Sequence, residues 1–317
     1  MTTEIYIISG FLGAGKTTLI QKLLKEAFMN HKVALIENDF GEISVDAALL
    51  KSGGIEVKEI NSGCICCSLS GDFVKALKEL LSRFHPDKIV IEPSGVGKLS
   101  DIMKACSDPL IQPHAKVMAK ITVADVKRCK MYLDNFGEFF EDQIQHADVI
   151  LLSRTENLPD KVDNARKLLK SLNTQAVIFS KPWNRITASE ILFPAQEYHT
   201  HSAHRDLIHM CNCGQHGQEH DCDHNHGAED IFDTVTIRTN QIFSMEDLKA
   251  RVSNMERIAQ GTILRAKGIV RGTNGYINLQ YLPGDIRMTN CATGGDMLCI
   301  IGRNLNRQEL VCLFNGK

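Results

Sequence analysis

The sequence predicts an α/β protein in which a mostly parallel sheet is covered by helices and is followed by a linker and a smaller α+β domain. In the first part of the chain, short apolar runs alternate with amphipathic helical patterns, which is typical of a parallel sheet buried on both faces. The pattern stops near Trp183, a polar stretch runs from Pro194 to Asp230, and periodicity resumes at Ile231. We therefore expect three segments with the bounds 1–193, 194–230 and 231–317.

Each expected strand is a short run of mostly apolar residues. In the first segment these runs are Ile5–Ile8, Val33–Glu37, Ile55–Ile60, Lys88–Glu92, Val117–Val123, Val149–Leu152 and Ala176–Phe179. In the last segment they are Ile231–Arg238, Ile263–Val270, Tyr276–Leu282 and Met297–Gly302. Apolar residues at helical spacing predict helices after the first strand and at Phe73–Phe84, Lys161–Leu172 and Met245–Met255.

Composition argues against several classes of function. The 36 lysines and arginines nearly balance the 38 aspartates and glutamates, so the chain lacks the net positive charge that drives general binding to nucleic acid. No apolar run approaches the roughly 20 residues that cross a membrane, and we see no leader sequence. We expect a cytoplasmic protein without nucleic-acid or membrane partners, and whether it forms a homo-oligomer stays open.

A glycine-rich loop lies between the first expected strand and the helix that follows it. Its sequence is Gly10-Phe11-Leu12-Gly13-Ala14-Gly15-Lys16-Thr17, followed by Thr18. Glycines let the backbone curl around an anion, so that N–H groups and the helix N-terminus point at phosphate oxygens. We expect Lys16 to reach the β- and γ-phosphates and Thr17 to place its hydroxyl on Mg²⁺. The loop therefore predicts a P-loop NTPase.

A third residue expected at the phosphate site is Glu92, which ends the apolar run from Lys88 and precedes Pro93-Ser94-Gly95. A strand beside a phosphate loop commonly ends in an acid that contacts Mg²⁺ or its water. We predict this role for Glu92, which makes Lys16, Thr17 and Glu92 the catalytic set. A surface glutamate at the end of a strand is the alternative.

Five motifs extend over nearly the whole chain. They are Gly10–Thr18, Glu37–Glu42 with Asp46, Gly63–Cys67, Glu92–Gly95 and Leu264–Gly268. Together they resemble the CobW-type GTPases, relatives of HypB and UreG. The resemblance implies GTP hydrolysis coupled to delivery of a transition metal, often zinc or cobalt, to a client protein. It also implies a CobW C-terminal domain that begins near Ile231, and a segment after Val33–Glu37 that senses the γ-phosphate.

The motif Cys64-Ile65-Cys66-Cys67 brings three thiols into one glycine-flanked loop. Thiolates so closely spaced can converge on one soft or borderline ion, with a fourth position left for His, a carboxylate, water or a client ligand. Such spacing does not fit a secreted disulfide framework, so reduced thiols that ligate metal are expected. Buried, unreactive cysteines are the alternative.

Three acids lie in or beside the γ-phosphate-sensing segment that the resemblance implies. We expect Asp39 to hold a Mg²⁺-bound water, and Glu37 and Glu42 to add oxygen ligands near the cysteine loop. A short acidic run is also typical of a solvated surface.

The family's guanine-reading motif Asn-Lys-x-Asp is replaced here by Ser153-Arg154-Thr155-Glu156. Glu156 can accept hydrogen bonds from guanine and Arg154 can lie over the base, but the side chain of Ser153 is shorter than that of asparagine. We expect GTP to be preferred over ATP, although less sharply than with the family motif.

The linker concentrates metal-binding side chains. Eight of the 12 histidines lie between His199 and His226, together with three cysteines. We expect this tract to capture or buffer metal through His209, Cys211, Cys213, His216, His220, Cys222, His224 and His226. A polar linker that is merely rich in histidine, or an expression tag, is the alternative.

The leading prediction is a GTP-hydrolysing metallochaperone that uses GTP and Mg²⁺ and carries zinc or cobalt to a client protein. A small-molecule kinase could use the same phosphate loop, but it would leave the cysteine loop and the histidine tract unexplained. A non-enzymatic metal buffer is the third alternative. A phosphorylated acceptor would favour the kinase, and full metal-dependent function in Lys16→Ala would favour the buffer.

Overall fold

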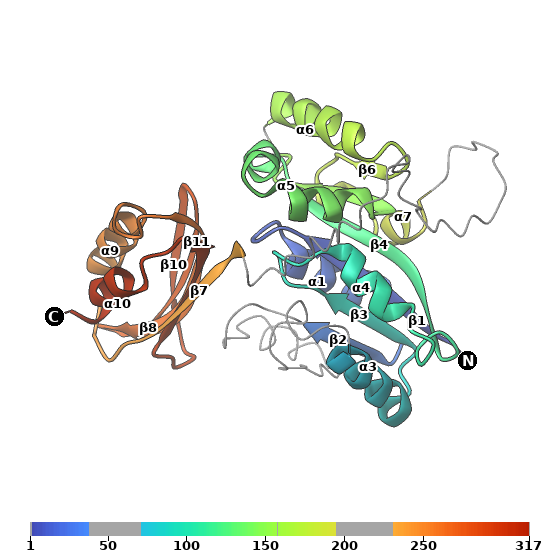
Figure 1. Ribbon diagram of the computed structural model, residues 1–317, viewed down its shortest axis with the longest axis horizontal. Coiled ribbons are helices and arrows are strands. Elements are labelled where there is room, and N and C mark those ends of the chain that lie inside the picture. The colour runs from blue at the N-terminus through green and yellow to red at the C-terminus, as the bar shows by residue number, and fades with distance from the viewer. Residues whose placement is uncertain (1, 38–70, 157, 195–230, 317) are drawn as a thin grey trace, which may run out of the picture.

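The computed structural model describes residues 2–37, 71–156, 158–194 and 231–316, which form two sheets with flanking helices (Figure 1). The first sheet is parallel, with the strand order β2-β3-β1-β4-β5-β6. Its strands are β1 (Thr3–Gly10), β2 (Val33–Glu37), β3 (Lys88–Glu92), β4 (Ala115–Asp125), β5 (Val149–Ser153) and β6 (Val177–Phe179).

Helices cover both faces of the first sheet. They are α1 (Lys16–Glu26), α3 (Gly71–Phe84), α4 (Leu99–Cys106), α5 (Cys129–Gln145), α6 (Pro159–Leu172) and α7 (Ala188–Leu192). Because side chains alternate along a strand, Tyr6 and Ile8 of β1 share a buried cluster with α1 and α7. Ile5 and Ile7 share another cluster with α3 and α4. The strands therefore have apolar residues on both sides, as their continuous hydrophobic runs predict.

The second sheet is antiparallel, with the order β10-β9-β8-β11-β7. Its strands are β7 (Asp233–Arg238), β8 (Thr262–Gly272), β9 (Gly275–Leu282), β10 (Asp285–Cys291) and β11 (Met297–Arg303), and its helices are α9 (Met245–Ile258) and α10 (Arg307–Asn315). The two helices bury one face of this sheet, where Leu248 and Phe314 join a common core.

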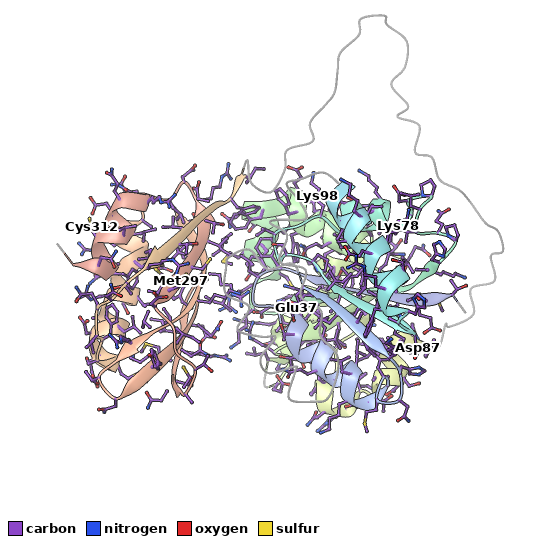
Figure 2. All side chains as sticks on the ribbon, turned by 90° about the horizontal axis from the view of Figure 1, so that it is seen from below. Glu37, Lys78, Asp87, Lys98, Met297 and Cys312 are labelled. Atoms are coloured by element: carbon purple, nitrogen blue, oxygen red, sulfur yellow. The ribbon has the colours of Figure 1, made fainter. Side chains whose placement is uncertain are left out.

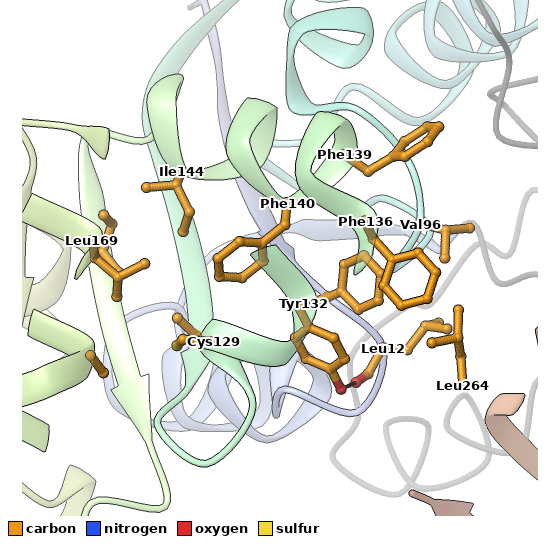
Figure 3. Packing of buried hydrophobic residues seen from close by; sticks show 14 of the residues in the cluster. Leu12, Val96, Cys129, Tyr132, Phe136, Phe139, Phe140, Ile144, Leu169 and Leu264 are labelled. Atoms are coloured by element: carbon orange, nitrogen blue, oxygen red, sulfur yellow. Dashed lines mark hydrogen bonds between the residues drawn. The ribbon is translucent and has the colours of Figure 1, made fainter. Parts of the chain in front are cut away.

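The opposite face of the second sheet packs against the first part of the chain. Leu264 of β8 and Ile301 of β11 belong to the same buried cluster as Leu12 of the glycine-rich loop and Phe136 of α5. Figure 3 shows Leu264 beside Leu12, with the aromatic rings of α5 next to them. The carboxyl ends of the parallel strands thus point toward the second sheet (Figure 1).

The predicted fold class is confirmed, with differences in detail. The expected strand Ile55–Ile60 lies outside the described residues. The expectation that periodicity stops near Trp183 is wrong, because α7 follows and begins with a capping box between Thr187 and Glu190. β10 and α10 were not predicted at all. In the part of the chain that the structure describes, no helix is long and apolar enough to cross a membrane.

Candidate functional site

The glycine-rich loop connects β1 to α1 in a conformation that only glycine adopts easily. Gly10 has φ 139°, and a Cβ added there would lie 2.4 Å from the carbonyl oxygen of Val123 on β4. Gly13 has φ 66°, in the left-handed region. Lys16, the first residue of α1, is 6% exposed, and its Nζ donates a hydrogen bond to the Gly10 carbonyl at 3.0 Å. The ammonium therefore lies over the loop at the N-terminus of the helix, where a phosphate would bind.

Thr17 and Glu92 meet Lys16 at the same place. Oγ1 of Thr17 donates a hydrogen bond to Oε2 of Glu92 at 3.3 Å, and Nζ of Lys16 lies 3.8 Å from Oε1 of Glu92. A hydroxyl and a carboxylate at this separation are the hard oxygen ligands that Mg²⁺ prefers. The three residues predicted as the catalytic set thus lie together, and their donor atoms fit Mg²⁺ with a nucleoside triphosphate.

Glu37 lies directly beside Glu92. The two residues end neighbouring strands and are register partners across β2 and β3. Figure 2 shows Glu37 at the end of the first sheet nearest the second sheet, with Asp87 at the far end. A metal ligand at Glu37 would therefore lie next to the candidate Mg²⁺ site.

The side chain of Arg154 contacts the glycine-rich loop. Its Nη2 donates to the Gly13 carbonyl at 3.0 Å, and its Nη1 pairs with Asp125, at the end of β4. Arg128 donates to the same carboxylate at 2.5 Å. The guanidinium is held by these contacts beside the loop, where its flat face could lie against a base.

Two buried hydroxyls near Arg154 have no hydrogen-bond partner among the described residues. They are Oγ of Ser153 and Oγ1 of Thr155, whose residues are 6% and 7% exposed. Burying an unpaired hydroxyl is unfavourable, so these groups fit a ligand with donors and acceptors, such as a nucleobase.

Trp183 follows β6 and packs against the glycine-rich loop. Its Cη2 atom lies 3.3 Å from the position of a Cβ added to Gly15, and Cβ of Ser153 lies 3.9 Å from the same position. Its Nε1 donates to the Leu152 carbonyl at 2.7 Å. The indole ring is thereby fixed at the candidate base end of the site.

The second sheet also contacts the glycine-rich loop. The side chain of Leu282 covers Gly13, since a Cβ there would lie 2.6 Å from Cδ1 of Leu282. Nη2 of Arg128 donates to the Pro283 carbonyl at 3.2 Å. Lys267 of β8 is 1% exposed. Desolvation lowers its pKa to about 8, although Cys299 and Glu37 raise it, and Lys16 lowers it further.

Several predicted site residues are not brought together by the structure. Thr18 and Glu156 are exposed, and Ala14 lies in the loop with its N–H donating to the Phe11 carbonyl at 3.1 Å. No group of three His, Cys, Asp or Glu side chains that could hold a metal occurs within the described ranges. The remaining predicted ligands lie outside those ranges: Asp39, Glu42, Cys64, Cys66, Cys67 and the histidine tract from His209 to His226.

Three residues at the site, Asp125, Arg128 and Trp183, were not predicted from the sequence. Asp125 ends an apolar strand in the same way as Glu92, which is a signal that could have identified it. Trp183 is the one tryptophan of the chain and follows the last parallel strand. Arg128 carries no local signal, since its role depends on contacts between distant residues.

Comparison with known proteins identifies both parts of the chain. Residues 4–180 match the nucleotide-binding domain of CobW/HypB/UreG, and residues 232–316 match the C-terminal domain of the cobalamin synthesis protein cobW. The chain is 28% identical over 291 residues to the zinc chaperone YeiR of Escherichia coli K12, covering 85% of each chain.

Two further proteins are similar to this chain. The zinc-regulated GTPase metalloprotein activator 1 of Schizosaccharomyces pombe is 29% identical over 200 residues, 59% of this chain and 48% of the relative. The Zn(II)-bound YjiA GTPase from E. coli aligns with 99% of this chain and 98% of its own, at 20% identity and a TM-score of 0.46. Since the nucleotide-binding family model covers more than half of the sequence, the chain belongs to the CobW/HypB/UreG family.

Proposed function

We propose that this GTPase of the CobW/HypB/UreG family is a metallochaperone that delivers zinc or cobalt to a client protein and couples delivery to GTP hydrolysis. The observation that carries the proposal is the pairing of Glu37 with Glu92 across β2 and β3. One carboxylate belongs to the candidate metal set and the other to the candidate Mg²⁺ set, so the two sites share one edge of the sheet.

The nucleotide side of the mechanism centres on Lys16, Thr17 and Glu92, which lie together. Backbone N–H groups of the loop and the α1 N-terminus hold the phosphates, and Lys16 supplies a positive charge to the β- and γ-phosphates. Thr17 and Glu92 would hold Mg²⁺, which when bound would offset charge that develops during phosphoryl transfer. The proposed nucleotide-binding residues are Gly10, Gly13, Ala14, Gly15, Lys16, Thr17, Thr18, Asp39, Ser153, Arg154 and Glu156.

The metal side combines hard and soft ligands. We assign Glu37 and Glu42 to the same ion as Cys64, Cys66 and Cys67, because thiolates with a carboxylate suit zinc and cobalt. The similarity to YeiR, a zinc chaperone of Escherichia coli, supports zinc as the cargo. The tract 199–226 then serves to collect ions before transfer, since a chain of imidazoles and thiols can bind metal without a preformed site.

Coupling follows from thermodynamic linkage. If GTP changes the affinity for the cargo ion, the ion must change the affinity for GTP by the same factor. Glu92 would respond to loss of the γ-phosphate and of Mg²⁺. Glu37, its register partner on the neighbouring strand, would then respond to any change in the position or charge of Glu92. Hydrolysis removes the γ-phosphate and thereby changes the field at the metal site.

The test is metal analysis of anaerobically purified full-length protein with a non-hydrolysable GTP analogue, with GDP and without nucleotide. We expect zinc occupancy to follow the nucleotide in the wild type and to become independent of it in Lys16→Ala. Cys66→Ser should remove the effect of zinc on the GTPase rate, whereas deletion of 199–226 should lower the number of bound ions and leave that effect intact. Occupancy that ignores the nucleotide in the wild type would contradict the proposal.

A further inference from the structure

A buried lysine of the second sheet faces the part of the chain that carries the candidate phosphate site: Lys267 is the register partner of Gln280, two residues before Leu282, whose side chain covers Gly13. Lys267 on β8 is the register partner of Cys299 on β11, so both side chains lie on the same face of the sheet. Cys299 belongs to the cluster that contains Leu12 of the glycine-rich loop. Lys267 therefore projects from the face that packs against the nucleotide-binding part of the chain.

The charges around Lys267 are those of the phosphate site. Desolvation lowers the pKa of Lys267, Glu37 raises it and Lys16 lowers it further, in keeping with a position that faces the candidate phosphate site. Lys267 is 1% exposed and Lys16 is 6% exposed, so neither charge is well screened by water. The carboxylates of Glu92 and Glu37 already offset part of this positive charge, and further anions would be favourable at such a buried site. Phosphates bound at Lys16 would provide such anions.

The position of Glu37 indicates which phosphate group Lys267 would contact. The loop backbone would surround the α- and β-phosphates, and Thr17 and Glu92 would hold Mg²⁺ on the side of the γ-phosphate. Glu92 accepts a hydrogen bond from Thr17, and these two residues form the candidate Mg²⁺ site. Glu37 on β2 is the register partner of Glu92. A cation close to both Glu37 and Lys16 is thus on the γ-phosphate side of the site.

The second sheet is held in this position by contacts that do not involve Lys267. Leu282 covers Gly13, Pro283 accepts a hydrogen bond from Arg128, and Leu264 packs in the cluster with Leu12. These contacts give the lysine a rigid support, as a phosphate ligand needs.

We propose that Lys267 is a ligand of the γ-phosphate, supplied in cis by the second sheet, and that it makes the protein bind nucleoside triphosphate in preference to diphosphate. The inference rests on the proposed function, because it assumes that Lys16, Thr17 and Glu92 bind Mg²⁺ and GTP. It adds that the C-terminal part of the chain completes the nucleotide site, and so responds directly to loss of the γ-phosphate.

The test compares affinities for GDP and for the β,γ-imido analogue of GTP, both with Mg²⁺, in full-length protein. Fluorescence of Trp183 reports binding, because its ring contacts Gly15 and the chain has one tryptophan. Lys267→Met keeps the length of the side chain and is tolerated better in a buried site than a polar group. We expect it to weaken binding of the analogue about tenfold and to leave GDP affinity within about twofold.

Two further variants separate charge from packing. Lys267→Arg keeps the charge, and it should retain most of the preference for triphosphate. Lys88→Gln removes another buried lysine, 9% exposed, which pairs with Glu4 at the opposite end of the first sheet. This control should not change the ratio of the two affinities, even if it lowers thermal stability.

A ratio of affinities in Lys267→Met equal to that of the wild type would overturn the inference, and so would equal weakening of both nucleotides. If Lys267→Met did not fold, the same ratio measured in Lys267→Gln would decide. These outcomes differ from failure of the proposed function, which would appear as wild-type protein that neither hydrolyses GTP nor changes its zinc occupancy with nucleotide.

Discussion

The hydroxyl of Thr17 donates a hydrogen bond to the carboxylate of Glu92 at 3.3 Å, joining two residues that lie 75 positions apart. The glycine-rich loop and β3 are thereby connected through the atoms that would hold Mg²⁺. Nζ of Lys16 lies 3.8 Å from the same carboxylate, so three residues of the candidate phosphate site meet at this point. If these residues bind Mg²⁺ and nucleotide as proposed, their prior arrangement would reduce the reorganisation needed on binding.

Glu92→Gln should reduce GTP hydrolysis about a hundredfold, because the amide keeps the size of the side chain but loses the charge that would hold Mg²⁺. Nucleotide binding should persist through the loop and Lys16. Phosphate release measured over a range of Mg²⁺ concentrations checks this, and Glu4→Gln at the far end of the sheet is the control. Wild-type turnover with unchanged Mg²⁺ dependence would show that Glu92 is not the acid of the site.

Ser153→Asn should sharpen the preference for GTP over ATP, because asparagine restores an amide that can reach the base. Thr155→Val removes a buried hydroxyl that has no partner among the described residues while keeping the shape of the side chain. Its thermal stability should therefore change little, and guanine affinity should fall if the base uses this hydroxyl. Competition of GTP with ATP in each variant is the measurement. If neither substitution changes the ratio, the segment Ser153–Glu156 does not read the base.

Gly13→Ala should destabilise the protein in two ways. The left-handed φ of 66° costs a residue with a Cβ about 1–2 kcal/mol, and the new methyl would press on Leu282. Gly284→Ala is a matched control, because Gly284 has φ 75° and nothing lies within 4 Å of its Cβ position. Thermal melts should therefore show a larger loss for Gly13→Ala, and Leu282→Ala in that background should recover part of it. Equal losses of stability at the two glycines would mean that the side chain of Leu282 moves aside without destabilising the protein.

His146 and Asp142 predict a pH-dependent contribution to stability. A side-chain hydrogen bond to Asp142 is the main cause of the raised pKa of His146. Burial raises the pKa of Asp142, but hydrogen bonds from His146 and Ser100 outweigh it, and the net pKa is lowered. The stabilisation by His146 is therefore fully present below its unfolded pKa of about 6.5 and is lost as pH rises through its higher folded pKa.

The melting temperature should consequently fall more in His146→Gln at pH 6 than at pH 8.5. His114→Gln, a change at an exposed histidine, is the control and should show no such difference. The effect is expected to be modest, since the side chain of His146 is 38% exposed and solvent screens the pair. The same loss at both pH values would mean that the charged pair does not contribute.

The sequence predicts the buried strands well but misses β10, one of the two edge strands of the second sheet, for a physical reason. β3 has the predicted bounds Lys88–Glu92, because a fully buried parallel strand is a continuous apolar run. β10 was missed because all residues of Asp285–Cys291 are exposed or half-buried, as an edge strand allows. The other edge strand, β7, was predicted because it buries Val235 and Ile237 in alternation. α10 is short and was likewise not predicted.

The candidate site also contains residues that the sequence predicts and residues that it does not. The loop from Gly10 to Thr17 could be predicted because its chemistry depends on local spacing. The position of Lys267 on the sheet face that packs against the glycine-rich loop could not be predicted, because it depends on how the second sheet packs. For Leu282 and Gly13 the same holds, since nothing in the sequence near either residue indicates that they touch.

The aromatic cluster that both parts of the chain share has a consequence for folding and for engineering. The ring of Phe232 packs 5.1 Å from that of Phe139 and 5.5 Å from that of Phe136, centroid to centroid. A truncated chain that ends before residue 231 would leave these two α5 rings partly uncovered, and such apolar patches promote aggregation. The two sheets should accordingly melt in one cooperative transition, and swapping in a foreign C-terminal module would first require a replacement for Phe232.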